Sequence, residues 1–374
     1  MEDLGLNRLF GGAYAGRRVL VTGHSGFKGS WLTLWLRTLG AQVLGLSLDP
    51  PSDPHHLALL AGLDLGCKEQ RLDLRDGPAL AAAVAGFAPE AVFHLAAQPL
   101  VRASYADPAA TFAVNLMGTV NLLEACRAVD GLKAVVVVTS DKCYENREWA
   151  WGYRESDPLG GRDPYSASKG CAEIATAAYR RSFFQAAAGG HPALVASARA
   201  GNVIGGGDWG ADRLVPDLVR AAAAGQRALL RHPQAVRPWQ HVLDPLAGYL
   251  LLAWRLIEGR ADLAAAFNFG PAGEGDLSVA GLAGRLAEQW PAVRYASDPA
   301  GLGLHEAANL RLDSSQAAAR LGWRPVWDAA EAVARTAQWH RAWQEEGRVT
   351  SAAQLADYCR QAAGLGLAWA QSWA

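Results

Sequence analysis

Short apolar runs alternate with longer segments of helical periodicity over about the first 200 residues. Runs that are apolar nearly throughout are typical of strands whose sheet is covered by helices on both faces. The expected strands lie at residues 17–21, 41–48, 91–95 and 133–139. Expected helices follow at about 27–39 and 107–129, and Asp107 opens the second as its N-cap, with a proline in the first turn. This alternation predicts an α/β fold with a doubly wound parallel sheet and right-handed crossovers.

The pattern changes beyond about residue 201. Three consecutive glycines at 205–207 indicate a loop, and a short strand at 266–269 is followed by amphipathic helices. We therefore expect a sheet domain over residues 1–200, interleaved with parts of 201–260. A smaller mixed α/β C-terminal lobe should bind the substrate over 201–350, and 351–374 should form a helical tail.

The composition is that of a globular chain with no strong charge bias. Apolar residues make up 51%, charged residues 19%, and the formal net charge is −1, which argues against a disordered chain and against partners such as nucleic acid or anionic membrane. Five scattered cysteines form no C-x-x-C pair, so we expect neither a disulfide framework nor a bound metal. The first residues lack the features of a signal peptide, and no uncharged apolar run is long enough to span a bilayer. We expect a cytoplasmic protein.

A glycine-rich turn joins the first expected strand to the first expected helix. In TGHSGFKG (residues 22–29) the glycines have the spacing G-x-x-G-x-x-G. Such glycines allow a tight turn and let the main chain approach a pyrophosphate at the N-terminus of the helix. A purely structural turn is the alternative, but the position directly after a buried strand favours a dinucleotide site of the Rossmann type. The expected cofactor contacts in this turn are Gly23, Ser25, Gly26, Phe27 and Gly29.

Two aspartates are candidates for the adenosine half of the cofactor. Asp49 lies at the end of the second strand, where a carboxylate can accept from ribose hydroxyls. No arginine follows it closely, so we favour NAD over NADP; a cap of the following turn is the alternative role for Asp49. Asp73 ends a third short strand and can accept from the adenine amine, but an N-cap for the next helix explains its spacing equally well. We also expect contacts along the cofactor from Leu74, Leu95, Ala96 and Ala97.

Two polar motifs supply candidate chemistry. Tyr165 and Lys169 in DPYSASK are four residues apart, hence on one helical face, and an ammonium one turn away stabilises a phenolate. Alone, such a pair is common on helix surfaces. Ser140, Asp141 and Lys142 follow the VVVV run, and ligands of open α/β sheets lie beyond such strand ends. Ordinary turn formation is the alternative for Ser140 and Asp141, whereas His94 is expected to be a satisfied core residue.

Taken together, these motifs make the chain resemble the extended short-chain dehydrogenase/reductases, and within them the CDP-glucose 4,6-dehydratase branch. The resemblance runs over about residues 19–246. It rests on VTGHSGFKGSWL, HLAAQPLVRASY, VNLMGTVNLLEA, TSDKCY, DPYSASK, ARAGNVIGGGDW, DRLVPD and RPWQHVLDPL. It implies an NAD-dependent lyase that oxidises the sugar at C4, eliminates water across C5–C6 and returns hydride to C6, in deoxysugar and O-antigen biosynthesis.

The resemblance also assigns roles to residues. Ser140, Tyr165 and Lys169 form the implied triad, and where related dehydratases carry Asp-Glu this chain has Asp141-Lys142. Lys142, directly or through a water, thus becomes the candidate for removing the C5 proton, with Asp141 protonating the departing 6-hydroxyl. Asn202 is implied to contact the sugar or diphosphate of CDP-glucose. Cytidine specificity rests on the resemblance alone, as does a homodimer through the helices near 107–129 and 164–184.

Arginines supply the remaining candidates for the nucleotide sugar. Arg213 and Arg237 suit the two phosphates, because guanidinium forks match phosphate geometry; loop-bridging arginines are the alternative. Arg102 and Tyr105 lie in the loop after HLAAQP, where they can reach the sugar. A C4 epimerase or reductase of the same superfamily is the alternative function, and would need no Asp-Lys pair. A non-catalytic dinucleotide-sensing protein is the alternative of another class, and would be expected to lack the tyrosine or the lysine.

Overall fold

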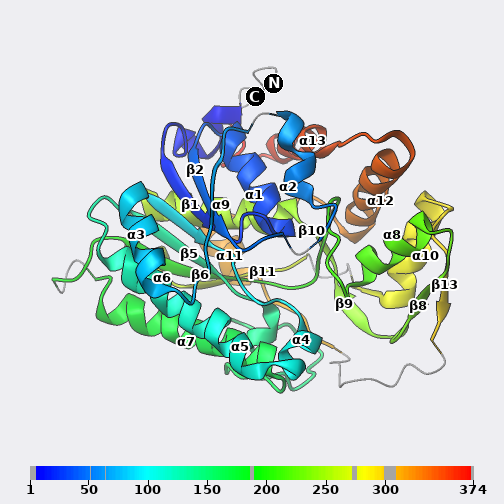
Figure 1. The fold of residues 1–374 in the computed structure, drawn as a ribbon, viewed down its shortest axis with the longest axis horizontal. Coiled ribbons are helices and arrows are strands. Elements are labelled where there is room, and N and C mark those ends of the chain that lie inside the picture. The colour runs from blue at the N-terminus through cyan, green and yellow to red at the C-terminus, as the bar shows by residue number, and fades with distance from the viewer. Residues whose placement is uncertain are drawn as a thin grey trace.

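A computed structural model describes residues 6–50, 52–63, 65–185, 189–271, 276–298 and 309–371. Within these ranges the central sheet has seven parallel strands in the order β11-β6-β5-β4-β1-β2-β3 (Figure 1). The strands are β1 (Arg18–Thr22), β2 (Gln42–Ser47), β3 (Lys68–Arg71), β4 (Ala91–His94), β5 (Ala134–Val138), β6 (Leu194–Ala200) and β11 (Ala266–Phe269). The order turns back between β1 and β4, which places a crevice at that switch point. The predicted doubly wound parallel fold is confirmed.

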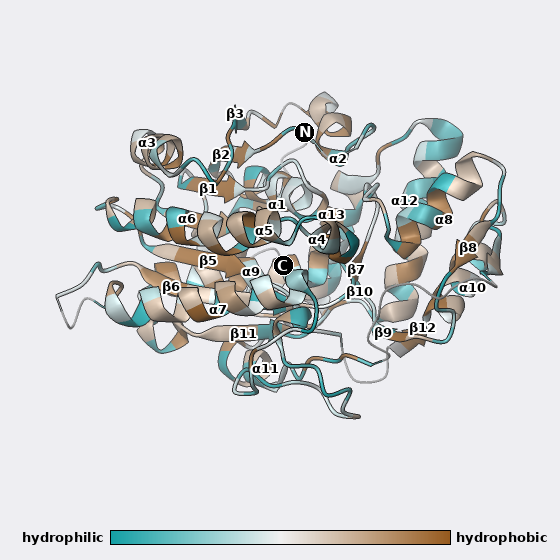
Figure 2. Cartoon of the chain, turned by 60° about the horizontal axis from the view of Figure 1, so that its bottom comes forward, coloured by the Kyte–Doolittle hydropathy of each residue, from teal (hydrophilic) through white to brown (hydrophobic). Residues whose placement is uncertain are grey.

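Helices cover both faces of the sheet, and Figure 2 shows apolar residues concentrated on the strands between them. One face is covered by α1 (Phe27–Thr38) and α9 (Leu243–Ile257), and α13 (Ser351–Gly364) packs on α1. The other carries α3 (Gly77–Phe87), α6 (Gly118–Arg127) and α7 (Pro164–Ser182). Burial of both faces explains why the strands are apolar nearly throughout. The exception is the edge strand β3, which is exposed along its length and has the polar sequence KEQR.

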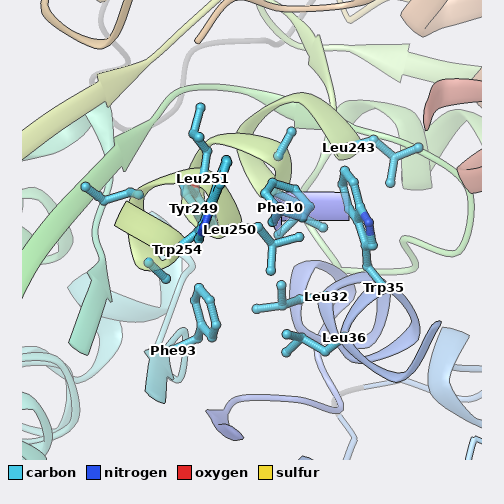
Figure 3. Close-up of a cluster of buried hydrophobic side chains, with 14 of the residues drawn as sticks. Phe10, Leu32, Trp35, Leu36, Phe93, Leu243, Tyr249, Leu250, Leu251 and Trp254 are labelled. Atoms are coloured by element: carbon cyan, nitrogen blue, oxygen red, sulfur yellow. The ribbon is translucent and has the colours of Figure 1, made fainter. Parts of the chain in front are cut away.

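The larger hydrophobic cluster joins the two ends of the chain. Phe10 lies against Trp35 of α1 and Trp254 of α9, as Figure 3 shows. Trp369, which follows α13, stacks on Phe10 with 4.9 Å between ring centroids. Tyr358 of α13 is also fully buried and donates to Asp244 of α9. The segment expected as a tail is thus part of the main core over its described residues.

Replacing Trp369 by alanine should therefore destabilise the whole sheet domain. The side chain is 1% exposed, and removing a buried tryptophan costs about 3–5 kcal/mol through lost burial and the cavity left behind. Urea denaturation followed by circular dichroism measures this loss. Trp151→Ala is the matched control, because Trp151 is 63% exposed and should change the free energy of unfolding little. Equal effects of the two variants would contradict this description of the core.

The helix expected at 107–129 is interrupted by a wider turn. Asp107 caps α5 (Pro108–Phe112) as predicted, but Ala113–Met117 (η3) is π-helical before α6 begins. Asn115 in this turn donates to Gln98 O and to Ser168 Oγ and accepts from Gln98 N, which ties the helix to the loop after β4 and to α7. Pro108–Arg127 taken together is long and apolar enough to cross a membrane by length and composition, and 44% of its most apolar window is buried in the fold.

A smaller lobe lies beside the carboxyl ends of the strands (Figure 1). It contains α8 (Leu214–Ala223), α10 (Val279–Gln289) and part of α12 (Ala329–Glu346), which share a separate hydrophobic cluster. Its short strand pairs are β7 (Val203–Ile204) with β10 (Gln240–His241), β8 (Ala228–Leu230) with β13 (Tyr295–Ser297), and β9 (Val236–Pro238) with β12 (Asp276–Ser278). Shorter helices are η1 (Leu6–Gly12), α2 (His56–Leu59), η2 (Ala61–Leu63), α4 (Val101–Ala106), η4 (Asp141–Cys143), η6 (Ala261–Leu263) and α11 (Ser315–Leu321).

The strand at 266–269 lies in a different part of the fold from the one predicted. It was expected in the smaller lobe, but as β11 it pairs with β6 and completes the central sheet. The chain thus returns to the sheet after it has formed much of the lobe. Sequence periodicity cannot show such a return, because it reports an element's type and not its neighbour.

Candidate active site

A cavity of about 1370 Å³ runs along the carboxyl ends of the central strands and between the sheet and the smaller lobe. Residues at one end follow β1, β2 and β3, and residues at the other belong to α8, β8 and β9. Residues that follow β5 and the first turns of α7 lie between these ends. A single cavity therefore holds both the candidate cofactor residues and the candidate catalytic residues.

The glycine turn has the geometry that a dinucleotide requires. Gly23 has a φ of +73°, and a Cβ there would come within 2.7 Å of Ala96 N. A Cβ at Gly29 would overlap the carbonyl oxygen of Gly23, so this glycine lets α1 pack closely on the turn. A Cβ at Gly26 would meet only Gly23 O, at 3.3 Å, and Gly26 lines the cavity. The turn is thus open toward the cavity at the N-terminus of α1, where a pyrophosphate fits.

Substituting Gly29 by alanine should abolish NAD binding. The added methyl group must displace either the Gly23 carbonyl or the start of α1, and both form the pyrophosphate cradle. Calorimetric titration of NAD measures the effect, with the far-ultraviolet spectrum as a check on folding. Gly86→Ala on α3 is the control, since a Cβ at Gly86 meets nothing within 4 Å. A folded Gly29→Ala protein that binds NAD like the parent would contradict the assignment.

Asp49 and Asp73 both line the cavity, and each is paired with an arginine. Arg71 at the end of β3 lies 3.1 Å from Asp49 (Nε to Oδ1). No arginine follows Asp49 closely in the sequence, but the neighbouring strand β3 brings Arg71 to it. Asp73 accepts from the side chain and main-chain N–H of Arg75, which hold the pKa of its carboxyl below the ordinary value. The alternative N-cap role of Asp73 is wrong, because Asp76 caps α3.

The remaining cofactor candidates line the same part of the cavity: Ser25, Phe27, Leu74, Leu95, Ala96 and Ala97. Ser25 donates to Ser47 at the end of β2, which fixes the turn against the sheet. His94 just before them is a core residue, as predicted. Its two ring nitrogens lie 2.7 Å from Thr22 Oγ1 and 3.0 Å from Thr119 Oγ1, and burial lowers its pKa to about 3.

The structure brings the three residues of the expected triad together. Asp163 caps α7, and its first turns present Tyr165 and Lys169 to the cavity beside Ser140 at the end of β5. Burial raises the pKa of Tyr165 to about 12, and a hydrogen bond with Ser140 acts in the opposite direction. Burial lowers the pKa of Lys169 to about 8. The phenol, the hydroxyl and the amine are therefore all shielded from bulk water, where charges on one group strongly affect the others.

Asp141 and Lys142 lie next to this triad. Asp141 is buried, and its Oδ1 accepts from Ser140 Oγ at 2.9 Å. Its Oδ2 is also buried and has no hydrogen-bond partner among the described residues. Burial raises the pKa of this carboxyl, which favours its protonated form. Lys142 also lines the cavity, so an acid and an amine are both within the site.

Four of the five substrate candidates line the cavity: Asn202, Arg213, Arg237 and Arg102. Arg213 binds Asp208 through Nη1 at 3.2 Å, and Arg102 lies 3.8 Å from Asp212. The fifth, Tyr105, is on α4 with 40% of its surface exposed and is not among the lining residues. Tyr105 lies one helical turn beyond Arg102, at the exposed C-terminal end of α4 (Val101–Ala106).

Lys28 is a further site residue, and it is not among those predicted from the sequence. It belongs to the glycine turn, lines the cavity and is partly buried, and the loss of solvation lowers its pKa to about 8. Arg213 and Lys169 act in the same direction, whereas the charge of Asp141 opposes them. The available signal was a lysine within the glycine-rich turn at residues 22–29.

The chain is similar to known proteins over most of its length. Residues 19–263 match the model of the NAD dependent epimerase/dehydratase family. The chain is 47% identical to a CDP-glucose 4,6-dehydratase of Salmonella typhimurium, over 92% of this chain and 97% of that protein. Its fold is similar to a dTDP-glucose 4,6-dehydratase of Streptomyces venezuelae with NAD bound (29% identity, 87% of this chain and 98% of that chain, TM-score 0.71).

A UDP-glucose 4-epimerase of Thermus thermophilus in complex with NAD is also similar (26% identity, 87% of this chain and 99% of that chain, TM-score 0.72). The dependence of the family on NAD confirms the cofactor predicted from the sequence. The resemblance found in the motifs is confirmed as well, since the relatives match over most of the chain. The chain belongs to the NAD dependent epimerase/dehydratase family.

Proposed function

We propose that this chain is a CDP-glucose 4,6-dehydratase, which converts CDP-D-glucose to CDP-4-dehydro-6-deoxy-D-glucose. The observation that carries the proposal is the Asp141-Lys142 pair, placed in one cavity with Ser140, Tyr165 and Lys169. An epimerase needs the three residues of the triad but has no step that requires an acid–amine pair. The 47% identity to the Salmonella typhimurium enzyme supports the same substrate.

The first step is removal of the 4-hydroxyl proton. Tyr165 as phenolate accepts this proton, and Ser140 holds the hydroxyl oxygen in line with it. The protonated Lys169 favours the phenolate by its charge. Bound NAD supplies the chemistry these side chains lack, since it accepts hydride from C4 and returns hydride at C6, and so ends the cycle unchanged.

The second step is loss of water across C5–C6. The C4 ketone acidifies the hydrogen on C5, and Lys142, directly or through a water, removes it as a proton. Asp141 gives its proton to the departing 6-hydroxyl, for which its raised pKa is suited, because the acid must still be protonated when the leaving group departs. A proton then returns to C5. The net reaction is the loss of one water from each sugar.

The smaller lobe is assigned to the nucleotide half of the substrate. Arg213 and Arg237 are the candidate ligands of the diphosphate, and both lie at the border between the catalytic residues and this lobe. Asn202 is assigned to the sugar or diphosphate. Each role is tested by substituting the residue and comparing the change in KM for the nucleotide sugar with the change in KM for NAD.

Two assays test the function. Incubation with NAD and CDP-, dTDP-, UDP- or GDP-glucose should give a 4-keto-6-deoxy sugar fastest from the cytidine nucleotide. Substrate deuterated at C4 should give product labelled at C6 of the same molecule, even when mixed with unlabelled substrate. Epimerised product without loss of water would instead identify a 4-epimerase, and absence of any turnover in the NAD-bound protein would identify a non-catalytic dinucleotide-binding protein.

We further propose a homodimer formed through α6 and α7, in the cytoplasm. Met117, which directly precedes α6, and Ile174 on α7 are large apolar side chains with about half of their surface exposed (49% and 58%). Such exposure on neighbouring helices fits an isologous contact. The five cysteines are unpaired, which suits a reducing compartment. Light scattering of the parent and of Ile174→Glu tests the dimer, which the charged variant should dissociate.

A further inference from the structure

A buried carboxylate joins the two elements that carry the triad. Glu173 lies on α7, one turn beyond Lys169, and is nearly inaccessible to solvent. Its Oε1 accepts from Thr139 Oγ1, and its Oε2 accepts from Ser197 Oγ at 2.7 Å and from Arg199 Nη2 at 2.8 Å. One side chain thus holds α7 against the end of β5 and against β6.

Arg199, the cation paired with Glu173, extends the connection to β11, the last strand of the sheet. Arg199 Nη1 donates to Tyr144 OH at 2.6 Å, and Tyr144 OH donates to Asn268 Oδ1 on β11 at 2.8 Å. The side chains of Arg199 and Glu173 are only 4% and 2% exposed. A buried ion pair is weak evidence for stability, because apolar residues of similar size often serve a fold as well or better. Its position, bonded to the residue before Ser140 and one helical turn from Lys169, points instead to a role in the reaction.

We propose that Glu173 is a positioning residue of the C4 oxidation, which keeps the Lys169 ammonium charged and fixes the strand end that carries Ser140. Thr139, which Glu173 binds, directly precedes Ser140 in the chain. The same carboxylate is one helical turn from Lys169, within range of its charge. Glu173 touches neither substrate nor cofactor, since it is not among the residues that line the cavity.

The groups around Lys169 make the charge of Glu173 important for keeping the Lys169 amine protonated. Burial lowers the pKa of Lys169 to about 8, and Glu173 is foremost among the groups that oppose the shift, followed by Cys143. The other titratable groups that interact with Lys169 are Lys28 of α1 and His94 of β4, and a cation on either disfavours a second cation. Without the charge of Glu173, Lys169 should lose its proton at a lower pH. The phenolate of Tyr165 would then lose the cation that favours it.

The experiment compares the pH profiles of kcat/KM for Glu173→Gln, Glu173→Asp and the double variant Glu173→Gln/Arg199→Met. Glu173→Gln should move the alkaline limb to lower pH by about one unit or more, with kcat reduced more than KM is changed. Glu173→Asp should restore most of the profile. The double variant removes both charges, so it should regain thermal stability yet keep the shifted limb. Asp244→Asn, at a buried carboxyl on α9 outside the cavity, should leave the limb in place.

Three outcomes would overturn the role of Glu173. These are an unshifted alkaline limb in Glu173→Gln, a double variant that recovers both stability and the parent profile, or an equal shift in Asp244→Asn. If Glu173→Gln fails to fold, the double variant carries the test alone. The role assigned to Glu173 rests on the proposed function, but the two fail differently. A parent enzyme that forms no 4-keto sugar rejects the function, whereas an active parent with unchanged variants rejects only this role.

Discussion

Tyr165→Phe should reduce kcat on CDP-glucose by about 10²–10⁴-fold, the usual contribution of a general base. The phenol is buried in the cavity beside Ser140, and the variant keeps the ring but removes the atom that accepts the 4-hydroxyl proton. The reaction should stop before C4 is oxidised. Substrate deuterated at C4 should then be recovered with its label in place, and nuclear magnetic resonance of the recovered sugar measures this.

Tyr179→Phe is the matched control for this variant. Tyr179 lies on the same helix, but its hydroxyl donates to Glu124 at the surface, away from the cavity. Its loss should leave kcat and KM near those of the parent. The assignment of Tyr165 fails if Tyr165→Phe, with an intact NAD affinity and melting temperature, still transfers the C4 label to C6 at the parent rate.

Those parts of the site that depend on local sequence were predictable. The turn at 22–29 requires glycines where its main chain is crowded, and α7 places Tyr165 and Lys169 on one face by helix geometry alone. The carboxyl ends of parallel strands meet at one edge of the sheet, so Ser140–Lys142 had to lie near the glycine turn. Period and position within an element were enough for these residues.

Contacts between distant segments were not predictable in the same way. The pairing of Arg71 with Asp49 depends on the register of β2 and β3, and that of Glu173 with Arg199 on the packing of α7 against β6. The place of Trp369 in the core depends on the path of the chain after α13. None of these partners is near the other in sequence, and a single sequence carries periodicity but no pairing information. Lys28 is different from these residues, because its place in the glycine turn at 22–29 marks it without any contact between distant segments.

Asp141→Asn should separate the second step of the reaction from the first. The amide keeps the size of the carboxyl and can still accept from Ser140 Oγ through its Oδ1, so C4 oxidation should continue. It has no proton to give at the departing 6-hydroxyl, and the loss of water should slow by about 10²–10⁴-fold. The expected species is a 4-keto sugar that retains its 6-hydroxyl, at no more than one equivalent per active site, because the hydride taken from C4 is not returned to C6. In deuterated water its C5 hydrogen should still exchange, because Lys142 is unchanged.

Folding and charge controls accompany this variant. Burial raises the pKa of Asp141 above its unfolded value, so the native state binds this proton more tightly and stability falls as pH rises between the two pKa values. At neutral pH the amide should therefore be at least as stable as the parent. Asp130→Asn removes an exposed carboxylate before β5, at the opposite edge of the sheet, and should not change the rate of dehydration. Loss of C5 exchange together with dehydration in Asp141→Asn would mean that Asp141, and not Lys142, handles the C5 proton.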